Sequence, residues 1–202
     1  MNALPTGGSI RPITRWGAPV MHRPCRPVEA FDDDLRTLVA DMVATMHAAD
    51  GVGLAANQVG VDLAVFVFDC PAEEGRSSVS GVVCNPALTL PAGRERSLVV
   101  SDEGCLSLPG AFVECARLEY VEVSGLDEAG TPVTYAGSSL LARCLQHETD
   151  HLRGTVFADK ISTKLRKRLY KEAARFADEF PVGWPADLPL DPLPRDREPE
   201  LP

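Results

Sequence analysis

The clearest periodic pattern in the chain lies between residues 32 and 51. Apolar residues recur there in steps of three and four, at Leu35, Leu38, Val39, Met42, Val43 and Met46. Because a helix turns once in about 3.6 residues, these positions share one face and predict an amphipathic helix. Three aspartates at residues 32–34 provide a cap and favourable charge at its start, and Gly51 is expected to end it.

Before and after this helix the pattern is shorter and more irregular. Residues 1–30 are punctuated by proline and are expected to form an irregular arm. Residues 61–69 predict a buried strand, and residues 71–81 predict a surface loop. Short strands, separated by Pro86, Pro91 and Gly93, are expected at residues 82–85, 88–90 and 98–100.

The next apolar stretches predict a hairpin. Residues 112–125 and 131–135 have strand character, and residues 127–130 have the composition of a turn. Several consecutive strands followed by helices indicate an α+β fold with a largely antiparallel sheet. No internal repeat and no glycine-rich phosphate-binding loop is present in the sequence.

A second helix is predicted from Ser138 or Ser139, either of which can cap it, to Gly154. Its apolar positions are Leu141, Cys144, Leu145, Thr149 and Leu152. It also carries His147 and His151, which lie four residues apart and therefore nearly above one another, with Glu148 beside the first. Two imidazoles with an adjacent carboxylate predict a metal site for hydrolysis, in which Glu148 is the base.

The third ligand decides the class of hydrolase. A zinc protease of the longer HExxHxxGxxH type needs a third histidine where this chain has Phe157, so that class is excluded. Cys144 is a poor candidate, because residues 144–151 span about 10.5 Å along a helix. A downstream glutamate, Glu172 or Glu179, remains open, and Cys105 is free to approach from the sheet side.

A further apolar stretch, Gly-Val-Gly-Leu-Ala-Ala-Asn-Gln at residues 51–58, ends in a carboxamide. Its glycines allow another chain to approach the backbone closely, although a crowded turn would explain them equally well. Gln58 needs a hydrogen-bond partner in such apolar surroundings, and its donor can serve an oxyanion.

Composition narrows the setting. The chain has 202 residues, 45% of them hydrophobic, which fits one globular domain at residues 1–180. Residues 181–202 contain seven prolines and are expected to form an acidic extended tail. No apolar run reaches the roughly 18 residues of a membrane span, and no signal peptide is recognised, so a cytoplasmic protein with six reduced cysteines is expected. The net charge of −9 argues against specific DNA binding.

Three stretches together resemble the motifs of bacterial-type peptide deformylase. They are residues 51–58, Glu-Gly-Cys-Leu-Ser at residues 103–107 and Gln-His-Glu-Thr-Asp-His at residues 146–151, and the resemblance extends from about residue 10 to about residue 180. It implies the deformylase fold, with mostly antiparallel sheets around a central helix that carries the HExxH-type motif. It also implies removal of the N-formyl group from formyl-methionine at the start of nascent chains, with release of formate.

The resemblance assigns a chemical role to six positions. Cys105, His147 and His151 are similar to the family's metal ligands, with Fe²⁺ the usual native ion and Zn²⁺, Ni²⁺ or Co²⁺ possible in its place. Glu148 would be the base that activates water and returns the proton to the leaving amine. The side chain of Gln58 and the backbone N–H of Leu106 would stabilise the oxyanion.

Other positions are similar to the family's substrate-binding and supporting residues. Gly53 would offer backbone hydrogen bonds to an extended peptide, and the methionine pocket would be shaped by Val52, Leu140 and Cys144, although plain core packing explains each of them alone. Glu103, Arg117 and Asp150 resemble supporting charges, and Arg117 is expected to pair with one of the two carboxylates.

The chain departs from the family at two places. Phe112 stands near the position where many relatives have a peptide-binding arginine, and Arg143 stands where some have an apolar residue, so that it either reaches solvent or reshapes the mouth of the site. The basic segment at residues 160–171 predicts a solvated helix, and the resemblance adds contact with the ribosome as an alternative.

Alternative functions are a metallopeptidase or other amide hydrolase on the same metal site, and a catalytically silent binding protein.

Overall fold

The computed structural model describes residues 4–72, 77–93 and 96–186. Its helices are α1 (Asp33–Ala48), α2 (Ser139–Leu152) and α3 (Thr163–Ala173), with short 3₁₀ helices η1 (Pro19–His22), η2 (Ala56–Val59) and η4 (Phe157–Asp159). Its strands are β1 (Gly53–Ala55), β2 (Val65–Cys70), β3 (Val79–Thr89), β4 (Leu98–Cys105), β5 (Leu108–Leu118), β6 (Tyr120–Leu126) and β7 (Pro132–Ser138). None of the described helices is both long and apolar enough to cross a membrane.

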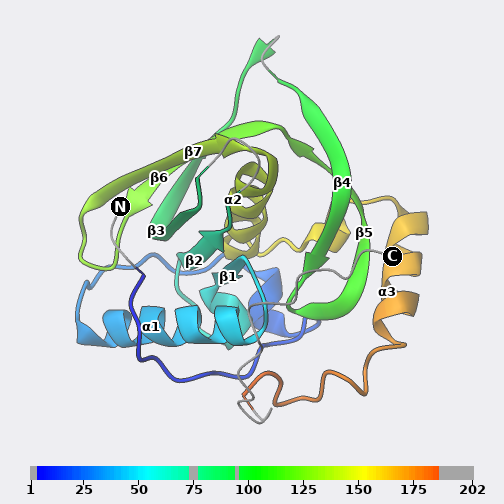
Figure 1. Cartoon of the computed structure of the whole chain (residues 1–202), viewed down its shortest axis with the longest axis horizontal. Helices are drawn as coiled ribbons and strands as arrows, with labels where there is room; N and C mark the ends of the chain where they lie inside the picture. The colour runs from blue at the N-terminus through cyan, green and yellow to red at the C-terminus, as the bar shows by residue number, and fades with distance from the viewer. Residues whose placement is uncertain (1–3, 73–76, 94–95, 187–202) are drawn as a thin grey trace, which may run out of the picture.

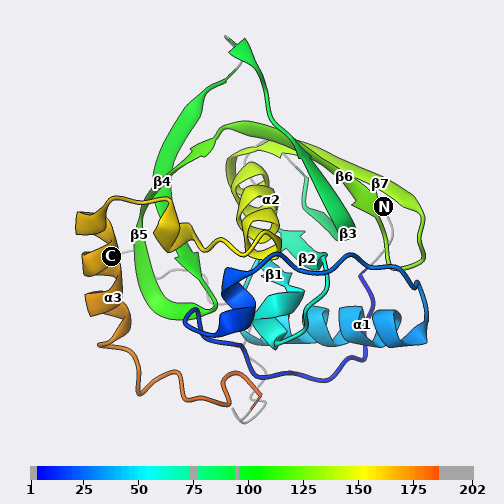
Figure 2. The same cartoon turned by 180° about the vertical axis from the view of Figure 1, so that it is seen from behind.

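Two antiparallel sheets enclose α2. The larger sheet has the order β1-β2-β3-β6-β7, and the smaller one contains β4 and β5. Figures 1 and 2 show α2 between the two sheets, with α1 below the larger sheet and α3 outside β5. The predicted α+β fold with mostly antiparallel sheets around a central helix is confirmed.

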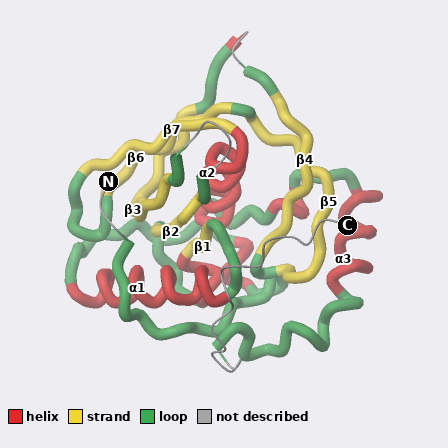
Figure 3. Tube along the Cα trace, in the orientation of Figure 1, coloured by secondary structure: helices red, strands yellow, loops and turns green. Residues whose placement is uncertain are grey.

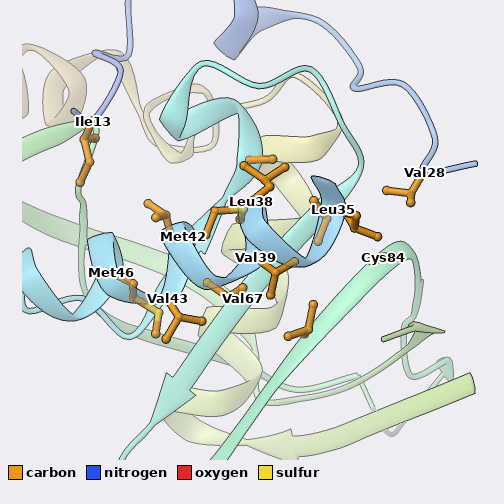
Figure 4. Packing of buried hydrophobic residues seen from close by; sticks show 14 of the residues in the cluster. Ile13, Val28, Leu35, Leu38, Val39, Met42, Val43, Met46, Val67 and Cys84 are labelled. Atoms are coloured by element: carbon orange, nitrogen blue, oxygen red, sulfur yellow. The ribbon is translucent and has the colours of Figure 1, made fainter. Parts of the chain in front are cut away.

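The predicted first helix forms, but it ends at Ala48, and the left-handed residue that follows it is Asp50, with a φ of 53°, rather than Gly51. Asp32 caps α1, because its side chain accepts a hydrogen bond from the backbone N–H of Leu35 at 3.1 Å. The apolar face of α1 packs against β1 and β2, and Figure 4 shows the side chains from Leu35 to Met46 gathered around Val67. This packing holds β1 in place below α2.

The strands differ from the prediction in several ways. The strand predicted at residues 61–69 begins only at Val65, as β2, and β3 begins at Val79, inside the predicted loop. β3 is one strand rather than two pieces, because Pro86 lies where the pairing with β6 shifts register, and a residue without an N–H is tolerated there. β4 continues to Cys105, well beyond residue 100. The expected hairpin exists as β6 and β7 around Asp127, whereas residues 112–118 belong to β5 and pair with β4.

The start of α2 also departs from expectation. Ser138 occupies the cap position, yet its side chain makes no capping hydrogen bond. At the other end, Gly154 follows the helix with a φ of 73°, as expected for a helix stop. Figure 3 shows α2 following β7 directly, without a loop between them.

The described part of the C-terminal segment returns to the core at Trp184, although Val182 is exposed. Trp184 is 5% exposed and joins the apolar cluster formed by α1 and β2. Residues 187–202, the rest of the predicted tail, lie outside the described residues, and the domain limit at residue 180 stays a prediction.

Candidate active site

Helix α2 brings two histidines to the centre of the molecule. His147 and His151 lie one turn apart on its buried face, and their Nε2 atoms are 3.1 Å apart. Both are at least 92% buried, because the two sheets cover this face of the helix. The spacing of the pair in the sequence therefore produces two ring nitrogens that point at one place.

Cys105 reaches the same place from β4. Its Sγ lies 3.3 Å from His151 Nε2, and the ligand atoms of Cys105, His147 and His151 all lie within 4.8 Å of one another. The pairing of β4 with β5 shifts register between Glu103 and Cys105, and such an irregularity turns a side chain to a new direction. Among the described residues, Cys105, His147 and His151 thus form a group whose ligand atoms could bind one metal ion.

The donor set fits a metal ion. One soft thiolate with two imidazoles suits zinc or a late first-row transition metal, and three protein ligands leave a coordination position open for water or substrate. The other ring nitrogen of His147, Nδ1, lies 2.8 Å from Glu103 Oε1. A hydrogen bond donated by Nδ1 leaves Nε2 with its lone pair facing the cluster, which is the tautomer that a ligand needs.

Glu103 is the centre of a buried charge network. Its Oε1 accepts from Arg117 Nη2 at 2.6 Å, and its Oε2 accepts from Arg117 Nε at 2.9 Å and from Arg143 Nη1 at 2.7 Å. Burial alone would raise the pKa of Glu103, but the hydrogen bonds from Arg117 and His147 hold it well below its usual range. Glu103 is therefore an anion that orients His147.

Arg117 extends this network to the end of α2. Its Nη1 donates to Asp150 Oδ2 at 2.5 Å, and Asp150 Oδ1 lies 3.1 Å from Lys160 Nζ. The sequence predicted that Arg117 pairs with one of two carboxylates, whereas it pairs with both. These contacts tie β4 and β5 to α2 from the side opposite the five-stranded sheet.

Glu148 points into the space beside Gly53. A Cβ atom at Gly53 would lie 2.5 Å from Glu148 Oε1 and 2.8 Å from Cys144 Sγ, so a side chain at residue 53 has no room. The other carboxylate oxygen, Oε2, is buried without a hydrogen-bond partner among the described residues. Burial raises the pKa of Glu148 to about 7. Such a carboxyl group can both accept and donate a proton near neutral pH.

Gln58 is held from both ends of its carboxamide. Its Oε1 accepts from the N–H of Ala55 at 2.8 Å, and its Nε2 donates to Ser107 Oγ at 3.3 Å. The same Nε2 lies 3.6 Å from Cys105 Sγ. The hydrogen-bond partners expected for this buried carboxamide are thus the backbone of Ala55, three residues earlier, and the side chain of Ser107, which follows Cys105 in the chain.

Most of the predicted site residues line one cavity of about 470 Å³. Its lining includes Cys105, His147, Glu148, Gln58, Leu106, Gly53, Val52, Leu140, Cys144 and Glu103. Arg117, Asp150 and His151 are absent from that lining, because they lie behind it. Cys144 Sγ donates to the carbonyl oxygen of Val52 at 3.4 Å, which joins two sides of the predicted methionine pocket.

The structure also places the two departures from the family pattern. Phe112 is 60% exposed, lies over Gly104 and lines the cavity. Arg143 does not reach into solvent, because it donates to Glu103 and to the carbonyl oxygen of Cys115 at 3.0 Å while also lining the cavity. Sequence reasoning did not anticipate its contact with Glu103.

Two aromatic residues of the cavity were missed altogether. Phe180 and Trp184 come from the segment after α3, which the sequence presented as the end of the domain and the beginning of a tail. No motif surrounds either residue. Only the path of the chain past the turn between β4 and β5 brings them to the site.

Comparisons with known proteins agree with this geometry. The family model for polypeptide deformylase matches residues 10–167. Peptide deformylase 1 of Streptomyces avermitilis is 52% identical over 176 residues, which cover 87% of this chain and 81% of that protein. The peptide deformylase of Mycolicibacterium smegmatis is 40% identical over 200 residues, covering 92% and 98%.

Solved structures give the same result. The peptide deformylase from Legionella pneumophila superimposes with a TM-score of 0.73 at 38% identity, covering 83% of this chain and 95% of that one. The enzyme from Synechococcus elongatus in complex with actinonin gives a TM-score of 0.70 at 38% identity, covering 84% and 88%. With its three motifs gathered around one cavity and this match over most of its length, the chain belongs to the polypeptide deformylase family.

Proposed function

We propose that the chain hydrolyses the formyl amide of formyl-methionine at the start of nascent chains, with Glu148 as the base and Gln58 as an oxyanion donor. Deformylases are metal-dependent enzymes that remove this group. The observation that carries the assignment of residues is their convergence: the thiol of Cys105, the imidazole of His147, the carboxylate of Glu148 and the carboxamide of Gln58 all line one cavity.

Cys105, His147 and His151 would hold one divalent ion, with Fe²⁺ as the native ion and Zn²⁺, Ni²⁺ or Co²⁺ as substitutes. The thiolate and two imidazoles suit all four ions. When bound, such an ion supplies a Lewis acid that lowers the pKa of water and polarises a carbonyl group. Glu103, Arg117 and Asp150 support the ligands, because they fix the ring of His147 and the end of β4 against α2.

Glu148 moves the proton in this scheme. Its carboxylate takes a proton from the attacking water, whose oxygen forms a bond to the formyl carbon. The C–N bond then breaks, and Glu148 returns the proton to the leaving nitrogen. The products are formate and a peptide with a free amine. The raised pKa of Glu148 suits both halves of this transfer.

The substrate lies along β1. This strand is an edge of the five-stranded sheet, so its outer backbone groups can pair with an extended peptide through Gly53. The methionine side chain then enters the space between Val52, Leu140 and Cys144, which line the cavity together. The flexible thioether of methionine fits such an apolar, irregular space.

Gln58 Nε2 and the backbone N–H of Leu106 would stabilise the negative charge that develops on the formyl oxygen. Replacing Gln58 by Ala is expected to lower kcat on a formyl-Met peptide by roughly 10²–10³-fold, the usual effect of losing one oxyanion donor. The matched control is Ser107→Ala, which removes the other partner of Nε2 and leaves the donor in place. A Gln58→Ala variant with the parental kcat would contradict the role of Gln58 as an oxyanion donor.

The overall assignment is tested by formate release. The protein, prepared anaerobically with ferrous iron, is expected to release formate from formyl-Met-Ala-Ser and no acetate from acetyl-Met-Ala-Ser. Treatment with a chelator should abolish the release, and Fe²⁺ should restore it. Cleavage of unformylated peptides without formate release would instead identify a metallopeptidase or another amide hydrolase.

We also propose a cytoplasmic location and contact with the ribosome through the basic segment at residues 160–171. Leu169 on the inner face of α3 is buried, whereas Lys164 and Lys167 on the same helix are exposed. Lys160 is already paired with Asp150 and is not part of this surface. Cations on a solvated helix face bind RNA phosphates in a salt-dependent way.

The double variant Lys164→Glu/Lys167→Glu is expected to lose co-sedimentation with ribosomes at low salt and to keep its activity on short peptides. The control is Arg96→Glu/Arg153→Glu, which reverses two charges at exposed positions elsewhere. Equal sedimentation of the two double variants would contradict the contact.

A further inference from the structure

The cavity of the active site has a side that the methionine pocket does not use. Leu140 and Cys144 belong to the apolar cluster around α2, whereas Phe180 and Trp184 belong to the cluster around α1. All four residues line the same cavity. Figures 1 and 2 show the segment after α3 passing below the turn between β4 and β5 toward the end of α1. Phe180 and Trp184 together form a second wall of the cavity, and both lie beyond residue 167, where the match to the family model ends.

The segment is fixed by contacts with the N-terminal arm. Arg15 donates to the carbonyl oxygen of Phe180 and, at 3.1 Å, to that of Pro181. The N–H of Ile13 donates to the carbonyl oxygen of Trp184 at 2.9 Å. The rings of Phe180 and Trp184 meet edge to face, with centroids 5.0 Å apart. A wall held in this way needs little ordering when a ligand binds.

The chemistry of this wall is aromatic and apolar. Trp184 is 5% exposed and supports the wall from the core, whereas Phe180 is only half-buried. Phe180 and Pro109 also line a neighbouring apolar cavity of about 300 Å³, so the ring of Phe180 stands between two hollows. Phe112, 60% exposed, lines the active-site cavity as well. A side chain that enters here exchanges water for aromatic surface.

The path of a bound peptide leads to this wall. Gly53 adjoins Cys144 and Glu148, so the formylated residue belongs there. Ala49 and Gly51 precede Gly53, line the same cavity, and Ala49 shares the apolar cluster of Phe180. β1 begins at Gly53, so a peptide that pairs antiparallel to β1 leaves the strand there and continues toward Gly51 and Ala49. The cavity lined by these residues continues to Phe180 and gives the second and third residues of the peptide a path to its ring.

We propose that Phe180, backed by Trp184, forms a subsite that selects substrates with an aromatic or large aliphatic side chain at the second or third position. The inference rests on the proposed deformylation of formyl-Met peptides and adds a preference beyond methionine. Phe112 adds apolar surface to the same cavity.

The test compares formyl-Met-Ala-Ala with formyl-Met-Phe-Ala and formyl-Met-Ala-Phe. The parental enzyme is expected to favour at least one phenylalanine peptide in kcat/KM by roughly three- to tenfold, the contribution of about one aromatic contact. Phe180→Ala should bring this ratio close to one, chiefly through a higher KM, because the contact is made in the ground state as well. Phe180→Tyr should restore the ratio.

The control is Phe176→Ala. Phe176 comes from the same segment and packs against Gly110, but it lines the neighbouring cavity and not the active-site cavity. The Phe176→Ala variant should have lower thermal stability and the parental ratio of kcat/KM between the phenylalanine and alanine peptides. An unchanged ratio in Phe180→Ala, or an equal loss on all three peptides, would overturn the subsite. In both results formate is still released, which separates them from failure of the proposed function, where the parental enzyme releases none.

Discussion

Replacing Glu148 by Gln is expected to lower kcat on a formyl-Met peptide by roughly 10²–10⁴-fold, the usual contribution of a positioned general base. The amide keeps the size of the carboxylate, which matters because Gly53 and Cys144 leave no spare room beside it. It cannot take a proton from water. Metal content should remain that of the parental protein, since Glu148 is not among the three converging ligand atoms.

Formate release and metal analysis on the same sample check this expectation. The matched control is Thr149→Val at the adjacent position, whose buried hydroxyl has no hydrogen-bond partner among the described residues. This variant should retain most of its turnover. A Glu148→Gln enzyme that works at nearly the parental rate would show that another group accepts the proton.

Replacing Cys105 by Ala is expected to remove both metal and activity. The two imidazoles from α2 remain, but the thiolate is lost, and it is the one of the three predicted ligands that comes from β4. Loss of a supporting residue around a metal lowers affinity by roughly 10–100-fold, and loss of a ligand should exceed that. Dialysis against a chelator followed by metal analysis measures the effect.

Cys84→Ala is the control for this variant. Cys84 is also a buried free thiol, but it lies in β3, in the apolar cluster under α1. It should lose some stability through the cavity left behind and keep its metal. Full metal content in Cys105→Ala would favour a third ligand from elsewhere in the chain and hence the metallopeptidase alternative.

Elements whose signals are local could be predicted from the sequence. The apolar face of α1 needs only its own periodicity and the cap at Asp32. The hairpin of β6 and β7 follows from Asp127, whose carboxylate accepts from the N–H groups of Ala129 and Thr131 and so encodes the turn. The motif on α2 works in the same way, because its spacing alone puts two imidazoles on one face.

Elements that depend on partners could not be predicted. Pro86 suggests a break in any strand read alone, and only the register shift against β6 makes it acceptable within β3. The strand character of residues 112–118 does not show whether β4 or β6 will pair with them. In the sequence, Arg143 resembles a solvated residue of an amphipathic helix. Its contacts with Glu103 and Cys115 depend on the position of the two-stranded sheet, which its local sequence does not encode.

The charge network around Glu103 has a consequence for how the active state arises. Glu103 and Arg117 belong to the two-stranded sheet, whereas His147 and Asp150 belong to α2. Separating the two surfaces would break the contacts of Glu103 with His147 and of Arg117 with Asp150, whereas Glu103 and Arg117 would keep each other as partners. The contact that orients the ring of His147 therefore forms only when the small sheet is docked on α2.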